Sequence, residues 1–303
     1  MIKKCVFGLC LTVITCFLVS CESGQPRAAA NVLKAVKGTN EEKIGTTSGS
    51  GIGAVAGSTA ANLKTLPIPD PKIIMARQEV PILCYHQIRD YRPGDSKSAR
   101  DYIVPTAIFR DQMKALADSG FTTILPEQLY GYLVAGQPLP EKPVMISFDD
   151  GCDEQFPVTN EILEPLNFKA AFFIMTVSVN RPNFMTSEQI RELANKGHSI
   201  GLHTWDHHNV KKYTGDDWVK QVEKPKLQLE KITGRPIQFF AYPFGLWNEA
   251  AVPELKLRGL IGAFQLSTSR DPASPLHTIR RIIVTGSWTG PQLVKRMSAG
   301  FSK

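Results

Sequence analysis

Beyond about residue 80 the chain alternates short strand-like runs with helical patterns, and this alternation restricts it to an α/β fold. In one helical pattern, for example, Phe109, Met113 and Leu116 fall on a single face. We expect strands at 80–85, 122–125, 144–148, 170–175, 199–202, 238–242, 262–266 and 279–284, and helices at 106–119, 126–135, 187–196, 218–233 and 248–258. Strands alternating with helices form βαβ units around a parallel sheet. Seven or eight such units in about 220 residues close most economically as a distorted (β/α) barrel.

The first 20 residues form a different kind of segment. Two lysines near the start precede an apolar run from Cys5 to Val19. A run of about 15 apolar residues after a basic start is typical of a secretory signal, because a membrane-spanning helix needs about 18 or more. Residues 18–21 resemble the lipobox of bacterial lipoproteins. We therefore expect residues 1–20 to be a lipoprotein signal peptide and Cys21 to carry lipid; the alternative is an ordinary signal peptide with a chance cysteine.

These features predict an exported protein of the bacterial cell envelope, anchored to a membrane through its lipid-bearing N-terminus. Glu22 follows the lipidated cysteine instead of the Asp that retains lipoproteins in the inner membrane, and this favours the outer membrane. Residues 21–77 are mostly small and polar without a sustained apolar period, so we expect a flexible linker there. The folded domain is expected at 78–303.

The net charge of the chain and its distribution indicate which classes of partner the protein can bind. Lys and Arg number 35 against 28 Asp and Glu, which gives a net charge of +7. The positive residues are spread along the chain without a dense basic run, so we expect no nucleic-acid binding. A mild positive bias also suits an anionic cell surface.

Two cysteines remain once the signal peptide is removed and Cys21 carries lipid. They are Cys84 and Cys152. In an oxidising compartment they could form a disulfide, and at strand ends they could equally stay as buried free thiols.

The first polar strand end follows the apolar run 144–148, which leads into Asp149, Asp150 and Gly151. Unpaired carboxylates at a buried strand end must be neutralised or find a cation. Adjacent strand residues point to opposite faces, so both acids can serve one site only where the strand ends and the chain turns, as Gly151 permits. A solvated turn that caps the following helix is the alternative.

The second polar strand end contains four of the six histidines of the chain: His198, His203, His207 and His208. His203 ends a predicted strand and His207 follows four residues later, a spacing at which two imidazoles can converge on one metal if the turn is helical. A polar loop whose histidines pair with acids is the alternative. We expect His198, at the opposite end of the strand, to be structural and His208 to lie behind the ligands or at the surface.

Together the two strand ends offer one carboxylate and two imidazoles for a metal, with a second carboxylate to spare. Such a ligand set leaves positions open for water and substrate, as in hydrolytic zinc sites and in iron oxygenases. A free acid beside a metal-activated water acts as a general base in hydrolysis, whereas an oxygenase needs no such base. The spare carboxylate therefore favours a hydrolase.

Residues 147–151 and 203–207 resemble the first two motifs of the polysaccharide deacetylases, carbohydrate esterase family 4, also called the NodB homology domain. The resemblance covers roughly 78–290 and extends to 80–86, 121–124 and 241–245. The opening segment and the Tyr-Pro-Phe-Gly sequence are most similar to the exported branch that acts on poly-β-1,6-N-acetylglucosamine. The resemblance implies the distorted (β/α) barrel of this family.

The same resemblance implies roles for individual residues. Asp149 is the general base, and Asp150, His203 and His207 bind a divalent metal ion, most often Zn²⁺. The backbone N–H of Tyr242 helps to stabilise the oxyanion, and losing such a donor typically costs about 2.7–4 kcal/mol of barrier height.

The chain departs from the wider family at two points. Ala241 stands where many members have an arginine that orients the base, and Arg280 and Arg281 could supply the missing charge. Many members also place a general-acid histidine after a late strand. Here the only late histidine is His277, which precedes its strand, so a general-acid role and a loop role are both open.

We expect substrate contacts from residues at strand ends and beside the motifs: Tyr85, His86, Trp205, Pro243 and Phe244. Aromatic faces can stack on sugar rings, although core packing accounts equally well for Tyr85 and Trp205.

The sequence therefore predicts a metal-dependent hydrolase that removes N-acetyl groups from an N-acetylglucosamine polymer: poly-β-1,6-N-acetylglucosamine, chitin or a peptidoglycan-like glycan. The alternatives are a carbohydrate O-acetyl esterase of the xylan type and a non-catalytic carbohydrate-binding lipoprotein. The intact pair of aspartates argues against the second, because a binding module has little need for a spare base.

Overall fold

The computed structural model describes residues 63–266 and 269–301. The predicted signal peptide, the lipidation site Cys21 and the first part of the linker lie outside these residues. Within the described part of the chain, no helix has the length and apolar character needed to cross a membrane.

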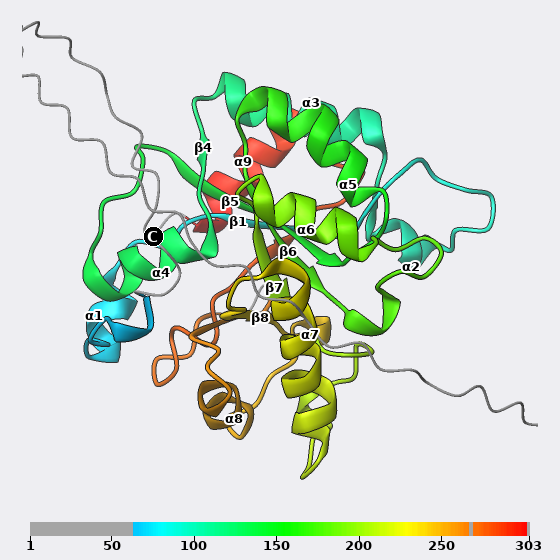
Figure 1. Cartoon of the computed structure of the whole chain (residues 1–303). Helices are drawn as coiled ribbons and strands as arrows, with labels where there is room; N and C mark the ends of the chain where they lie inside the picture. Colours follow the sequence, from blue (N-terminus) through cyan, green and yellow to red (C-terminus); the bar gives the residue numbers. More distant parts are fainter. Residues whose placement is uncertain (1–62, 267–268, 302–303) are drawn as a thin grey trace, which may run out of the picture. The chain divides into compact units, whose positions relative to one another are not determined.

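A curled parallel sheet forms the centre of the fold (Figure 1). Its strands are β1 (Ile82–Tyr85), β4 (Thr122–Thr123), β5 (Pro143–Asp150), β6 (Ala170–Ile174), β7 (Ser199–Leu202), β8 (Phe239–Ala241), β9 (Gly262–Phe264) and β10 (Ile282–Ile283). They follow the order β10-β1-β5-β6-β7-β8-β9, and β4 pairs with the start of β5. A short pair that the sequence did not predict, β2 (Gln87–Ile88) and β3 (Ile103–Val104), lies outside this sheet. The eight expected strands are all present.

The last strand segment closes the sheet into a distorted barrel. Ile282 in β10 lies opposite Leu83 in β1, and Ile279, three residues earlier, pairs with Phe264 in β9. The segment 279–283 therefore contacts both edges of the sheet. Because every pairing in this sheet is parallel, the carboxyl ends of the strands gather at one end of the barrel. The predicted distorted (β/α) barrel is confirmed.

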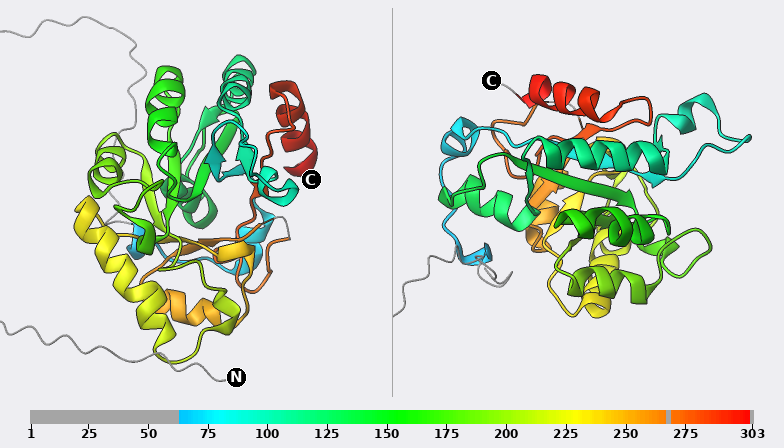
Figure 2. Two further views of the ribbon diagram at one scale, coloured as in Figure 1. Left: turned by 90° about the vertical axis from the view of Figure 1, so that its right-hand side faces the viewer. Right: turned by 90° about the horizontal axis from the view of Figure 1, so that it is seen from above.

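Helices surround the sheet (Figure 2). They are α1 (Pro71–Ala76), α2 (Lys97–Arg100), α3 (Thr106–Asp118), α4 (Pro126–Ala135), α5 (Gln155–Val158), α6 (Ser187–Asn195), α7 (Lys224–Thr233), α8 (Ala251–Leu257) and α9 (Gly290–Phe301). The helix expected at 218–233 instead begins with a π-helical turn, Val219–Glu223, and becomes α7 around Pro225, which has no N–H for a regular helix. Helix α9, which was not expected from the sequence, packs against α3.

Alternation along the strands separates the apolar side chains into two layers. One layer fills the barrel and includes Ile82, Met145, Phe173, Phe239 and Phe264. The other lies between the sheet and the helices and includes Leu83, Ile146, Phe172 and Phe240. Since strand residues two apart share a face, Cys84, Ser147 and Asp149 continue the inner layer toward the carboxyl ends. The inner layer thus becomes polar where the strands end.

The folded part of the chain begins earlier than predicted. Leu63 is 2% exposed and Ile74, in α1, is 1% exposed, and both belong to the inner apolar layer. Asp70 caps α1 by accepting a hydrogen bond from the N–H of Lys72. The predicted linker 21–77 is therefore wrong over its last part: isolated apolar residues there, too sparse to form a period, pack into the barrel.

Candidate functional site

The three predicted metal ligands converge at the carboxyl ends of the strands. Asp150 ends β5, His203 follows β7 directly, and His207 lies in the next turn. Oδ1 of Asp150 lies 3.6 Å from Nε2 of His203 and 3.7 Å from Nε2 of His207. Ligand atoms that each lie about 2.0–2.2 Å from a tetrahedral ion are roughly 3.4 Å apart. Asp150 therefore lies at a suitable distance from each imidazole, and all three ligand atoms lie within 4.8 Å of one another.

The protonation of His203 also fits a metal ligand. Its Nδ1 lies 2.7 Å from the backbone oxygen of Ala241, and because a carbonyl can only accept, Nδ1 donates that bond. Nε2 is then unprotonated in the neutral ring, and this buried atom has no hydrogen-bond partner among the described residues. An orphaned imidazole nitrogen facing a carboxylate and a second imidazole suits a divalent cation, and the bond to Ala241 would hold the ring in place.

Left-handed backbone conformations cluster around this site. Asp150, Thr204, His207 and Phe244 have φ values of 72°, 67°, 64° and 60°. Such conformations are unfavourable for residues with a Cβ and are typical of functional sites held by the surrounding structure. At Asp150 the left-handed turn breaks the strand alternation, so that both aspartates serve the same site, as predicted.

Arg281 holds the predicted base. Its Nη1 donates to Oδ1 of Asp149 at 2.6 Å and its Nη2 donates to Oδ2 at 2.8 Å; both side chains are almost completely buried. Nη1 also lies 3.2 Å from Oγ of Ser147. Burial opposes ionisation of Asp149, but the charge and hydrogen bonds of Arg281 hold the pKa of this carboxyl well below its usual value. Arg281 thus supplies the charge that Ala241 lacks.

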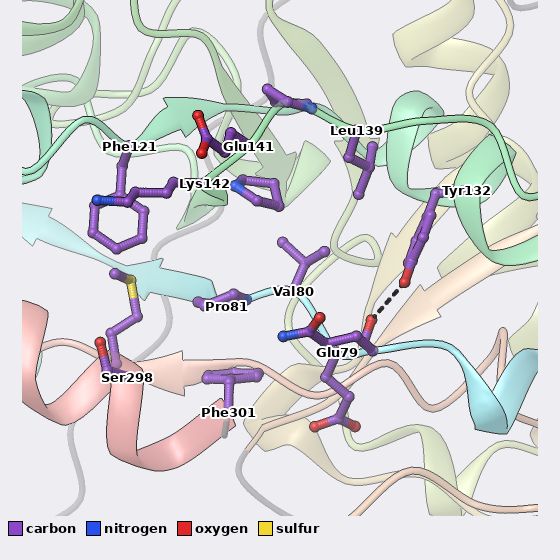
Figure 3. Close-up of a pocket in the computed structure, with 14 residues that line it drawn as sticks. Glu79, Val80, Pro81, Phe121, Tyr132, Leu139, Glu141, Lys142, Ser298 and Phe301 are labelled. Atoms are coloured by element: carbon purple, nitrogen blue, oxygen red, sulfur yellow. Dashed lines mark hydrogen bonds between the residues drawn. The ribbon is translucent and has the colours of Figure 1, made fainter. Parts of the chain in front are cut away.

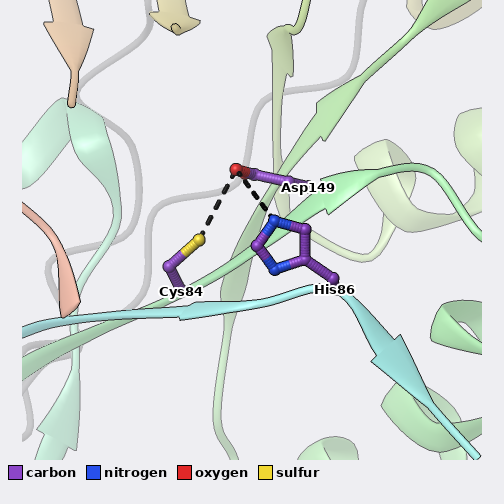
Figure 4. Close-up of side chains that lie close together, drawn as sticks. All are labelled: Cys84, His86 and Asp149. Carbon is purple, nitrogen blue, oxygen red and sulfur yellow. Dashed lines mark hydrogen bonds and ion pairs between the residues drawn. The ribbon is translucent and has the colours of Figure 1, made fainter. Parts of the chain in front are cut away.

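One oxygen of Asp149 faces the site. Oδ2 lies 4.0 Å from Nε2 of both His86 and His203, and Cys84 donates a 3.5 Å hydrogen bond to it (Figure 4). Desolvation raises the pKa of the Cys84 thiol well above its usual value, so the sulfur keeps its proton and can donate. Arg281 holds both oxygens, but Oδ2 is the one that also lies near the two imidazoles, so Oδ2 is the candidate proton acceptor.

His86 is closer to the chemistry than the sequence analysis expected. Its side chain is 14% exposed, its ring lies edge-on to Tyr102 with centroids 5.0 Å apart, and its Nδ1 is buried with no partner in the described part of the chain. Burial lowers the pKa of His86, while the negative charge of Asp149 opposes this shift. The sequence feature that could have indicated this is that His86 directly follows β1, the strand that pairs with β5.

The oxyanion donor predicted at Tyr242 is wrong. The N–H of Tyr242 donates to the oxygen of Phe264 in β9, so the sheet already uses it. In the following turn, the N–H groups of Gly245 and Leu246 donate to nearby carbonyls, and Pro243 has none. The remaining backbone donor of the turn is Phe244.

The general acid considered at His277 is also wrong. Its Nε2 lies 3.0 Å from the oxygen of Leu260, just before β9 begins, and its ring is buried. The site lies at the carboxyl ends of the strands, whereas His277 lies at the amino end of β9. His277 precedes its predicted strand in the sequence, and this order already indicated the amino end rather than the carboxyl end.

The expected substrate contacts divide into two groups. Tyr85 is fully buried on the outer layer and donates from its hydroxyl to Gln112, and Pro243 is buried, so neither can meet a polymer. Phe244 is 58% exposed and its ring lies 4.4 Å from that of His207. Trp205 is half-buried under the ammonium group of Lys220, 4.4 Å from the ring centre. Phe244 and His86 thus remain at the open side of the site.

Both remaining cysteines are free and buried. This settles the alternatives for Cys84 and Cys152 in favour of thiols. The predictions for the other histidines also hold: His198 is buried and bonded to Glu164, and His208 is an exposed residue beside Asp206.

A cavity of about 450 Å³ lies away from this site (Figure 3). Its walls include Val80 and Pro81 before β1, Pro143 at the start of β5, and Phe301 in α9. It therefore opens at the amino ends of the strands, and none of the site residues lines it.

Comparison with known proteins supports the resemblance that the motifs indicated. Residues 136–261, which include both aspartates and all three candidate ligands, match the family model described as polysaccharide deacetylase. The chain carries a polysaccharide deacetylase domain. The family match and the relatives support a deacetylase hydrolase over a non-catalytic carbohydrate-binding protein.

Two curated relatives show the breadth of the match. The deacetylase is 28% identical over 242 residues to the poly-beta-1,6-N-acetyl-D-glucosamine N-deacetylase of Staphylococcus aureus strain MRSA252, covering 72% of this chain and 82% of the relative. It is 33% identical over 165 residues to the peptidoglycan-N-acetylglucosamine deacetylase of Bacillus cereus, covering 51% of this chain and 57% of the relative.

A solved structure matches the fold of the deacetylase. The Streptococcus pyogenes deacetylase PplD, in complex with acetate, has a TM-score of 0.66 and 23% identity. The match covers 72% of this chain and 98% of PplD. At this identity the likeness concerns the barrel alone.

Proposed function

We propose that this protein is a divalent-metal-dependent N-deacetylase of an N-acetylglucosamine polymer, with poly-β-1,6-N-acetylglucosamine as the first candidate substrate. The convergence of Asp150, His203 and His207 beside the buried Asp149 carries the proposal. The substrate rests on similarity: the relative named for that polymer matches 72% of this chain, against 51% for the relative named for peptidoglycan.

Asp149 accepts the proton of the attacking water. Its Oδ2 faces the imidazoles of His86 and His203, while Arg281 holds the carboxylate in its charged form. When a divalent ion is held by Asp150, His203 and His207, it polarises the acetamide carbonyl and makes water more acidic. The N–H of Phe244, beside the ring of His207, is the candidate donor to the developing oxyanion.

His86 provides the proton that the leaving amine needs. Its ring lies on the same side of Asp149 as the open site, with Nε2 within 4.0 Å of the base. Water gives a hydroxide to the acetyl carbon and one proton to Asp149, and the C–N bond breaks as protonated His86 gives its proton to the nitrogen, which forms acetic acid and the amine. Transfer of the proton from Asp149 to His86 restores both groups, and acetic acid gives its proton to the amine. The products are acetate and a free amino sugar, so atoms and charge balance.

Acetate release tests this function. The protein loaded with Zn²⁺ is incubated with β-1,6-linked N-acetylglucosamine oligomers, chitin oligomers, peptidoglycan fragments and acetylxylan. We expect acetate from the β-1,6 oligomers, loss of activity with a chelator, and loss of turnover with retained metal in Asp149→Asn. Release from acetylxylan alone would identify an O-acetyl esterase instead, and full activity in Asp149→Asn would refute the assigned base.

We also propose that the enzyme is exported and anchored to the bacterial envelope by lipid on Cys21, with a preference for the outer membrane. The basic start, the apolar run of 15 residues and the lipobox-like residues 18–21 support this. Labelling with a fatty-acid analogue should mark the wild type but not Cys21→Ala, and membrane fractionation should find the variant in the soluble fraction. Equal labelling of both would contradict the anchor.

A further inference from the structure

Gln155 joins the backbones of His86 and Asp149, the proposed proton donor and the proposed base. It is the first residue of α5, and its side chain is fully buried. Its Nε2 donates to the backbone oxygen of His86 at 2.8 Å and to the backbone oxygen of Asp149 at 2.7 Å. One amide group therefore uses both of its protons to connect two strand ends that lie 63 residues apart in sequence, as the positions 86 and 149 show.

The two bonds replace a strand pairing that has ended. The ladder between β1 and β5 runs from Ile82 opposite Met145 to Tyr85 opposite Phe148. His86 and Asp149 are the next residues on the two strands, beyond the last pair of the ladder. Their relative position therefore depends on something other than the sheet, and Gln155 connects them at this point.

We propose that Gln155 is a positioning residue that sets the separation between His86 and Asp149, and thereby aligns the proton donor and the proton acceptor. The proposal rests on the roles given to these two residues above. Gln155 touches their backbones and not the reacting atoms, so it acts through them.

The unpaired oxygen of Gln155 supports a role beyond stability. Its Oε1 is buried and has no hydrogen-bond partner among the described residues. Native proteins rarely leave a buried acceptor unsatisfied, because its lost hydration is not recovered. This unsatisfied oxygen belongs to the amide that connects the proposed acid to the proposed base. An apolar side chain at this position would avoid the unsatisfied oxygen but would not connect the two carbonyls.

A second buried glutamine provides a matched control. Gln112 in α3 is also fully buried, and its Nε2 donates to the backbone oxygens of Trp288 at 2.7 Å and Thr285 at 3.4 Å. Gln112 thus connects two backbone carbonyls as Gln155 does, but these lie in the loop before α9 and outside the site. Replacing either glutamine with methionine keeps the side-chain length and removes both bonds to backbone carbonyls. Gln112→Met also removes the acceptor of the Tyr85 hydroxyl, so this control loses one hydrogen bond more than Gln155→Met.

The experiment compares Gln155→Met and Gln112→Met in the full-length, metal-loaded enzyme. Melting temperature, bound metal, kcat and KM are measured with the substrate that gives acetate in the wild type. We expect Gln112→Met to lose at least as much thermal stability as Gln155→Met, and both variants to keep their metal. Only Gln155→Met should lose kcat, by roughly 10- to 100-fold with little change in KM, because a misplacement of about 1 Å can cost 10²-fold in rate.

Gln155→Asn provides a second variant if Gln155→Met does not fold. Its amide is one methylene shorter, so it can reach at most one of the two carbonyls, and we expect a smaller loss of kcat with full metal content. Equal kcat values in Gln155→Met and Gln112→Met would overturn the proposal, as would loss of metal in Gln155→Met. Absence of acetate release by the wild type would instead contradict the proposed function and is seen before any variant is made.

Discussion

Replacing Arg281 with methionine should destabilise the protein strongly. The guanidinium makes two charge-assisted hydrogen bonds to Asp149, at 2.6 and 2.8 Å, and the two side chains are 0% and 3% exposed. Removing one partner of a buried ion pair leaves an uncompensated charge and typically costs about 3–5 kcal/mol. We expect a loss of this size in the free energy of unfolding of Arg281→Met at neutral pH.

The loss should depend on pH, and its sign follows from the pKa of Asp149. In the wild type this pKa lies below the unfolded value of about 4, so the stabilisation is present above pH 4 and disappears as the pH falls. In Arg281→Met burial raises the pKa of Asp149 against the smaller opposing effect of His203 and His86, so the buried charge becomes increasingly costly as the pH rises. The deficit should therefore be smaller at pH 4 than at pH 7.

Urea unfolding of the metal-free protein, followed by circular dichroism between pH 4 and pH 8, measures this deficit. The double variant Asp149→Asn/Arg281→Met removes both charges and should recover most of the lost stability. A deficit that stays constant over this pH range, together with no recovery in the double variant, would refute the argument that the ion pair causes it.

Three further predictions concern single positions. Asp150→Ala should lose bound metal in elemental analysis because one of three ligands is removed. Phe244→Ala should raise KM for the polymer while metal content stays unchanged, since only the exposed ring is lost. His277→Gln should keep wild-type kcat because its ring lies at the amino end of β9. Burial lowers the pKa of His277 to about 4, so wild-type stability should fall as the pH drops from about 6.5 toward 4, and thermal melts should show less of this fall in the variant.

Local sequence patterns were sufficient to predict the strands of the sheet and the candidate metal ligands. The β-branched and aromatic runs predicted the eight strands of the sheet, because burial on both faces requires apolar residues at every position. Asp150, His203 and His207 were recognisable because the carboxyl ends of parallel strands meet at one end of a barrel. The position of such residues at strand ends is therefore sufficient to predict that they lie close together.

The roles of His277 and Tyr242 could not be predicted in the same way. The sequence places His277 before its strand, but only the structure shows that its ring is bonded to the oxygen of Leu260, away from the site. The N–H of Tyr242 is used by β9, and no pattern around residue 242 indicates which neighbouring strand would take it. Both errors concern partners that come from distant parts of the chain.

The sequence by itself determined an α/β barrel with acids and imidazoles at the ends of its strands, because the period of apolar residues and the identity of a ligand are local properties. Only the tertiary structure decided which groups surround the base. Arg281 and Asp149 are 132 residues apart, and they meet because the segment 279–283 closes the barrel between β9 and β1. The partner of a buried charge is the group that closure of the sheet brings within hydrogen-bonding distance, and this depends on the whole fold.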